Sequence, residues 1–167
     1  MRRRADPCRS ALVHPRPAVA VHQDVVRRAV DEICANPSIE VGGKFVGYVS
    51  GELVPNARDW RRQFRRTTIS IVGYLDVGPR AHRSAVRHLS DTDYQFALFQ
   101  RLLAEFPALE FVGIWHSHHP NGLSQLSCGD VDTGLRTVNS PGHDLPFLLS
   151  SLAVDSSGLM SGRHYAF

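Results

Sequence analysis

The segment Phe111-Val-Gly-Ile-Trp-His-Ser-His118, followed at a distance by Ser127-Cys-Gly-Asp130, decides how this chain is interpreted. Phe111 to His116 is an apolar run rich in strand-forming residues, which predicts a strand in the core of a sheet. Residues two apart on a strand project from the same face, whereas on a helix the same spacing would turn them apart. His116 and His118 can therefore share a metal ion at the end of this strand.

Asp130 is a candidate for the third metal ligand. Zinc binds imidazole nitrogen and carboxylate oxygen tetrahedrally, and a catalytic zinc site uses three protein ligands and keeps a fourth position for water. The order Ser127-Cys-Gly-Asp130 also matches the start of a helix, with Ser127 at the N-cap and the acid favoured by the helix dipole. On the sequence alone, both interpretations of Asp130 stay open.

The remaining chain alternates helix-like and strand-like patterns. A helix begins near Asp24 and is stopped by Asn36-Pro37, and a second begins after Ser90-Asp-Thr-Asp93 and ends at Pro107. Apolar residues cover much of the second helix, so we expect it to be well buried. The other predicted elements are strands at 40–50, 67–77, 147–154 and 162–167 and a short helix at 130–138. This order predicts an α/β fold with a mixed sheet flanked by helices.

The length of 167 residues, 43% of them hydrophobic, predicts one globular domain. Residues 1–20 contain several prolines and no apolar period, so we expect a mobile N-terminal tail and a folded domain from 21 to 167. No apolar run approaches the roughly 18 to 20 residues of a membrane span, and the basic start lacks the apolar stretch of a secretory signal. We therefore expect a cytoplasmic protein.

The number of cysteines and the net charge bear on which kinds of site and partner this protein has. Cys8, Cys34 and Cys128 are odd in number and lack paired spacing, which argues against a disulfide framework and a cysteine-rich zinc site. The net charge of +3 comes almost wholly from arginine, because Lys44 is the only lysine. The basic stretch Arg58–Arg66 could suit a nucleic-acid backbone, but no nucleic-acid motif accompanies it. We expect a solvent-facing or partner-facing loop and no nucleic-acid partner.

Taken together, Glu40, His116-x-His118 and Ser127-x-x-Asp130 resemble the JAMM motif of the JAB/MPN metalloprotease family. That motif is a glutamate, then His-x-His, then Ser-x-x-Asp. The stretch Glu40-Val-Gly-Gly-Lys-Phe-Val-Gly47 is also similar to the family's glutamate, glycine and strand pattern, and the resemblance spans about residues 24 to 160. Several elements must agree in type, order and distance, which makes the signal specific. The His-Ser-His-His-Pro form is similar to bacterial members of the family.

The resemblance implies a three-layer MPN/JAB-like fold of the cytidine-deaminase-like kind. It further implies that His116, His118 and Asp130 hold Zn²⁺, that Glu40 activates the water on the metal, and that Ser127 donates a hydrogen bond to the oxyanion. The implied reaction is hydrolysis of an amide or isopeptide bond after the C-terminal tail of a ubiquitin-like protein. A ubiquitin-like protein or its conjugate is accordingly the expected substrate partner.

One feature departs from the family pattern. Eight residues, 119 to 126, separate His118 from Ser127, where the family usually has seven. We assign the extra residue to His119, which should face away from His118 because the following Pro120 keeps it extended. Two alternatives stay open: a non-catalytic MPN scaffold that docks protein partners, which predicts lost ligands, and a metal hydrolase acting on short peptides or a small carrier-protein adduct.

Overall fold

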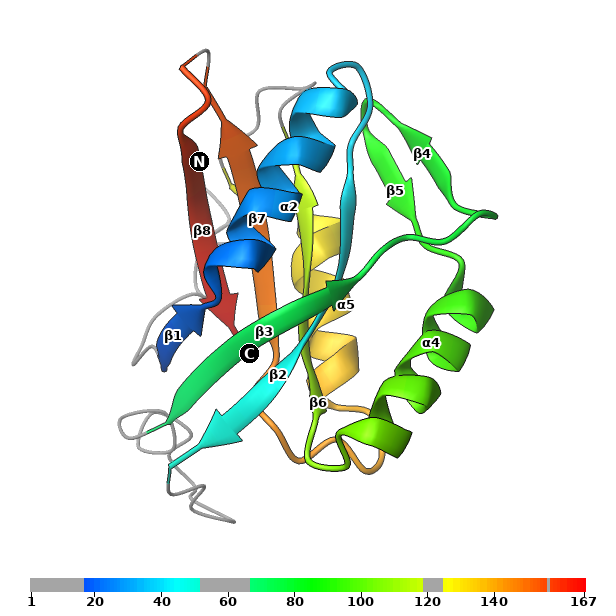
Figure 1. Ribbon diagram of the computed structural model, residues 1–167, viewed down its shortest axis with the longest axis vertical. Coiled ribbons are helices and arrows are strands. Elements are labelled where there is room, and N and C mark those ends of the chain that lie inside the picture. Colours follow the sequence, from blue (N-terminus) through cyan, green and yellow to red (C-terminus); the bar gives the residue numbers. More distant parts are fainter. Residues whose placement is uncertain (1–16, 52–66, 119–124, 156) are drawn as a thin grey trace, which may run out of the picture.

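A computed structural model of the chain describes residues 17–51, 67–118, 125–155 and 157–167. They form an α/β fold with a mixed, curled six-stranded sheet in the order β1-β3-β2-β6-β7-β8, flanked by three helices (Figure 1). A separate pair, β4-β5, lies beside it. The strands are β1 (Ala18–Val21), β2 (Gly42–Ser50), β3 (Thr68–Leu75), β4 (His82–Ser84), β5 (Arg87–Leu89), β6 (Glu110–Ser117), β7 (Leu148–Val154) and β8 (Met160–Ala166). The helices are α2 (Gln23–Ala35), α4 (Thr92–Glu105) and α5 (Cys128–Val138).

The predicted core strand is confirmed as β6, which lies inside the sheet. It pairs antiparallel with β2 and parallel with β7, so both of its edges are hydrogen-bonded. Trp115 is buried and contacts the rings of Phe45 and Tyr74, with centroids 6.4 and 5.2 Å away. A strand covered on both faces reads as a continuous apolar run, which is the pattern that predicted it.

The first helix covers one face of the sheet because its apolar residues recur at helical spacing. Val25, Ala29 and Ile33 of α2 are buried in a cluster with residues of the sheet, including Phe45 and Trp115. The helix begins after His22, whose side chain accepts from the backbone N–H of Asp24, and ends at Ala35, before Asn36-Pro37. The helices α4 and α5 lie on the opposite face of the sheet.

The prediction that α4 is well buried is wrong. Phe96 is 63% exposed, and Gln95 is the one fully buried side chain of the helix. One side of α4 packs against the sheet through Leu98, Phe99, Leu102 and Leu103, which contact a cluster of Val46, Leu75 and Leu109. Figure 1 places α4 at one side of the molecule, so its outer side meets no other helix of the described chain.

Three features of the fold were not predicted. The short strand β1 pairs in parallel with β3 and begins at Ala18, three residues before the expected start. The pair β4-β5 has only three residues in each strand. Glu40 precedes β2 and is not part of it.

Residues 1–16, Arg58–Arg66 and His119 lie outside the described residues. Within the described part, no helix is long and apolar enough to cross a membrane.

Close packing of β6 against β7 gives a test of the sheet. Gly113 pairs with Leu148, and a Cβ at Gly113 would lie 2.2 Å from the Leu148 carbonyl oxygen. We expect Gly113→Ala to lower the free energy of unfolding by about 1 to 3 kcal/mol, because backbone atoms cannot yield as a side chain can. The control Gly73→Ala in β3, whose Cβ meets only Val46 Cγ2 at 3.3 Å, should change it by less than about 1 kcal/mol. Urea unfolding of both variants checks this, and equal midpoints would contradict it.

Candidate metal centre

The two histidines come together at the end of β6. Their Nε2 atoms lie 2.7 Å apart, and the residues are only 7% and 3% exposed. The same strand alternation turns the side chain of Ser117, which lies between them in the sequence, to the other face. Ser117 is fully buried, accepts a hydrogen bond from the Val41 N–H at 3.0 Å and donates its own N–H to the Val41 carbonyl at 2.8 Å. His116 and His118 are thus held on one face by a serine fixed on the other.

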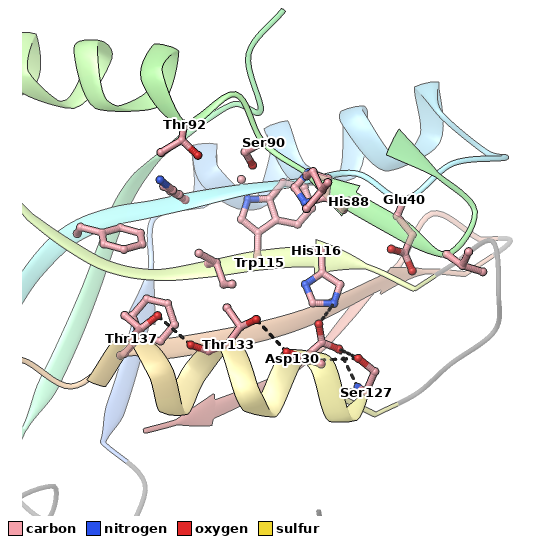
Figure 2. A pocket seen from close by; sticks show the side chains of 18 residues that line it. Glu40, His88, Ser90, Thr92, Trp115, His116, Ser127, Asp130, Thr133 and Thr137 are labelled. Carbon is pink, nitrogen blue, oxygen red and sulfur yellow. Dashed lines mark hydrogen bonds and ion pairs between the residues drawn. The ribbon is translucent and has the colours of Figure 1, made fainter. Parts of the chain in front are cut away.

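Asp130 reaches the histidines from the first turn of α5. Its carboxylate lies 3.4 Å from His116 Nε2 through Oδ1 and 3.7 Å from His118 Nε2 through Oδ2. The same residue completes a capping box, because Ser127 Oγ accepts from the Asp130 N–H and Asp130 Oδ2 accepts from the Ser127 N–H. Figure 2 shows the pairing of Asp130 with Ser127 and its approach to His116. The two interpretations of Asp130 are therefore compatible, since the cap fixes the carboxylate where a ligand is required.

The electrostatics keep this carboxylate ionised. Burial raises the pKa of Asp130, but hydrogen bonding and charge attraction from His116, together with hydrogen bonds from Ser127, outweigh it and lower the pKa to about 2. A metal ligand must be deprotonated to bind. Asp130 meets this condition throughout the neutral range.

These three residues could bind a metal ion. Their ligand atoms all lie within 4.8 Å of one another. Two atoms that share one zinc ion at about 2.0 to 2.2 Å are at most about 4 Å apart, and the separations of 2.7, 3.4 and 3.7 Å meet that limit. Ser151 Oγ of β7 lies 3.4 Å from His118 Nδ1. This contact orients the ring so that Nε2 faces the site, as outer hydrogen bonds to metal-binding histidines commonly do.

Glu40 lies beside the site because β2 approaches β6 closely. Gly42 pairs with His116, and a Cβ there would be 2.3 Å from the Trp115 carbonyl oxygen, so no other residue allows this approach. The Glu40 N–H donates to the Ser84 carbonyl at 2.8 Å, which ties Glu40 to β4. Glu40 is 6% exposed, and Figure 2 shows its carboxylate pointing toward the opening in which His116 and Asp130 lie.

Glu40, His116 and Asp130 share one cavity of about 540 Å³. It lies between α5 on one side and β5 with the start of α4 on the other (Figure 2). Its lining comprises Glu40, Gly43, Lys44, Val86, His88, Leu89, Ser90, Thr92, Phe111, Ile114, Trp115, His116, Ser127, Gly129, Asp130, Thr133, Thr137 and Phe147.

Sequence reasoning missed His88 as a residue of this cavity. Its Nε2 atom is buried and has no hydrogen-bond partner among the residues that the structure describes, and the same holds for Trp115 Nε1. Burial, then the charges of His116 and Arg83, lower the pKa of His88 to about 4, so its ring is neutral at neutral pH. His88 belongs to a three-residue strand, which is too short to give a periodic signal.

No protein-family model matches the chain, and a search of curated proteins gives no significant match. The chemical interpretation therefore depends on the motif and on the geometry around it. Every residue of the predicted site is described and lies in one region, while His119 is outside the described residues.

Asp130→Ala should remove most of the metal from the purified protein, because it deletes one of three ligands. Metal analysis of the wild type should give about one ion per chain. Loss of a cap alone would cost about 0.5 to 2 kcal/mol of stability and leave the metal in place. The control Asp132→Ala removes an exposed carboxylate of the same helix, paired with Arg136, and should keep the metal. Full metal content in Asp130→Ala would show that Asp130 only caps α5.

Proposed function

We propose that this protein is a zinc-dependent amide hydrolase of the JAB/MPN metalloprotease type, with the three-layer fold of that family. The observation that carries the proposal is the convergence of two buried histidines with a capped aspartate, in a place where His116, Asp130 and Glu40 line one cavity. Two separate sequence segments supply the histidines and the aspartate, and a third supplies Glu40. A motif spread over the chain that closes into one site is hard to explain by helix capping alone.

The donor set favours zinc. Two imidazole nitrogens and one carboxylate oxygen suit a tetrahedral zinc site with an open fourth position, whereas calcium and magnesium prefer oxygen ligands. Zinc bound there supplies an acidified water, with a pKa lowered from 15.7 to about 7, and polarises the substrate carbonyl. His116, His118 and Asp130 are the residues that would hold it.

Glu40 is the proposed general base. Its carboxylate takes a proton from the attacking water and gives it to the departing amine, a role usually worth about 10²- to 10⁴-fold in rate. The residue suits this role because its position is fixed: its own N–H is bound to Ser84, and its neighbour Val41 is bound in both directions to Ser117. Such a base does not need to be ordered when substrate binds.

Ser127 is the proposed donor to the oxyanion of the tetrahedral intermediate. A donor of this kind typically contributes about 10²- to 10³-fold. Ser127 Oγ donates its single proton to Asp130 Oδ2 at 2.7 Å. To serve the oxyanion the hydroxyl must rotate away from Asp130, while its lone pair can still accept from the Asp130 N–H.

The proposed substrate is an amide or isopeptide bond that follows the C-terminal tail of a ubiquitin-like protein, as the motif resemblance implies. Retention of the complete ligand set argues against a non-catalytic scaffold, which has no need of it. A hydrolase of short peptides or of a carrier-protein adduct would use the same chemistry. Assays with a ubiquitin-like fusion and with short peptides separate the two classes of substrate.

Glu40→Gln should keep its metal and its fold and lose hydrolysis by at least about 100-fold, because the amide preserves shape but cannot accept a proton. The control Glu110→Gln changes an exposed carboxylate of β6 and should retain the parent rate. Metal content, thermal unfolding and cleavage of both substrate types are measured on each variant. A Glu40→Gln rate within tenfold of the parent would rule out Glu40 as the general base.

A further inference from the structure

Lys44, the only lysine of the chain, occupies an unusual place for a cation. It lies on β2, an interior strand of the sheet between β3 and β6, and lines the cavity that holds the candidate metal site. Its ammonium lies 5.5 Å from the ring centre of Phe111. Phe111 in turn contacts the ring of Phe147, so this part of the cavity has an apolar wall.

Nothing described in the chain neutralises this charge. No carboxylate of the described residues lies within 4 Å of the Lys44 ammonium, which instead contacts the ring of Phe111. Burial lowers the pKa of Lys44 below its ordinary value, with no acidic group acting against that effect. A half-buried cation without an anion loses part of its hydration, and the contact with the Phe111 ring offsets only part of that cost. A position that costs stability is a candidate for function.

The cavity carries opposite charges in different parts. Glu40 and Asp130 lie with His116, whereas Lys44 lies farther along the sheet. Gly42 pairs with His116 and Lys44 pairs with Ile114, so the backbone of Lys44 lies two residues along, about 7 Å at the rise of a strand. Its ammonium reaches farther from His116, toward the ring of Phe111. Figure 2 shows the cavity wall continuing along α5 from Asp130 to Thr137. A ligand that spans it meets the metal site with one part and a cation with another.

We propose that Lys44 binds a carboxylate on the leaving side of the scissile bond, an inference that rests on the proposed hydrolase function. The volume of about 540 Å³ suits a small ligand and excludes a folded ubiquitin-like domain. An extended segment fits it, and we assign the cavity to the segment on the leaving side of the bond. One residue spans about 3.3 to 3.6 Å, so a backbone offset of about 7 Å, with the ammonium reaching farther, places the carboxylate two or more residues beyond the bond that is cut.

Two sources supply such a carboxylate: the C-terminus of a short leaving segment, or an acidic side chain within a longer one. Three peptides with the same ubiquitin-like tail separate them. The first leaves glycyl-glycine with a free carboxylate, the second leaves glycyl-glycine amide, and the third leaves glycyl-glutamate amide. A preference for the first alone assigns the C-terminus, and an equal preference for the first and third assigns either carboxylate.

In steady-state kinetics, the wild type should have a KM about tenfold lower for a carboxylate-bearing peptide than for the peptide that leaves glycyl-glycine amide, as charge-assisted hydrogen bonds allow. Lys44→Met should abolish this difference by raising KM for the carboxylate peptides alone, with kcat changed less than about twofold. Lys44→Arg should retain part of the preference. The control Arg136→Met removes an exposed cation of α5, outside the cavity lining, and should keep the full preference.

Binding is measured separately from catalysis. Protein labelled with ¹³C-lysine gives a single Cε signal, which N-acetylglycine should shift and N-acetylglycinamide should not, in the wild type and in metal-depleted His118→Ala. If no peptide is cleaved but this shift occurs, the carboxylate site stands and the hydrolase proposal fails. If peptides are cleaved without a carboxylate preference, or if Lys44→Met keeps that preference, the Lys44 inference is overturned and the hydrolase proposal stands. Lys44→Met should also unfold no more readily than the wild type, because it removes a desolvated charge.

Discussion

The pair of hydrogen bonds between Val41 and Ser117 is the constraint on which the site depends. Both residues are fully buried, and each bond joins segments that lie 76 residues apart in the chain. On one side of this pair Glu40 enters the cavity, and on the other His116 and His118 project from β6. The pair extends the β2–β6 ladder beyond Gly42 and His116, and so holds Glu40 beside the end of β6. The serine of the His-Ser-His sequence therefore helps to keep the proposed base next to the candidate ligands.

Asp130 adds a second coupling, between helix stability and metal binding. Its Oδ2 accepts from both the N–H and the hydroxyl of Ser127 at 2.7 Å, while its carboxylate faces both histidines. The cap orders the carboxylate before any ion binds, so less conformational entropy is lost on binding. In return, an ion held by Asp130 would strengthen the first turn of α5. The sequence Ser-x-x-Asp thus caps the helix and places a candidate ligand through one geometry.

The parts of the fold that could be predicted are those with a local signal. The β6 strand, α2 and the start of α5 follow from an apolar run, a helical period and a cap, and the three candidate metal ligands follow from residue type and spacing. The exposure of α4 could not be predicted, because composition gives apolar content and not which side meets the sheet. The strands β1, β4 and β5 have three or four residues, too few for a period. His88 and Lys44 became candidates only through a cavity formed by elements distant in sequence.

The two faces of the sheet explain why such a cavity is tolerated. The face under α2 carries a continuous apolar cluster that includes Phe45, Trp115 and Leu148, and this cluster holds most of the buried hydrophobic residues of the described chain. On the opposite face, α4 packs on Val46, Leu75 and Leu109, and α5 lies over β7. The space between these helices is where polar side chains of β2, β5 and β6 can point without breaking the core. Because stability is concentrated on one face, the other can hold unpaired polar groups, which a sheet with two equally packed faces could not.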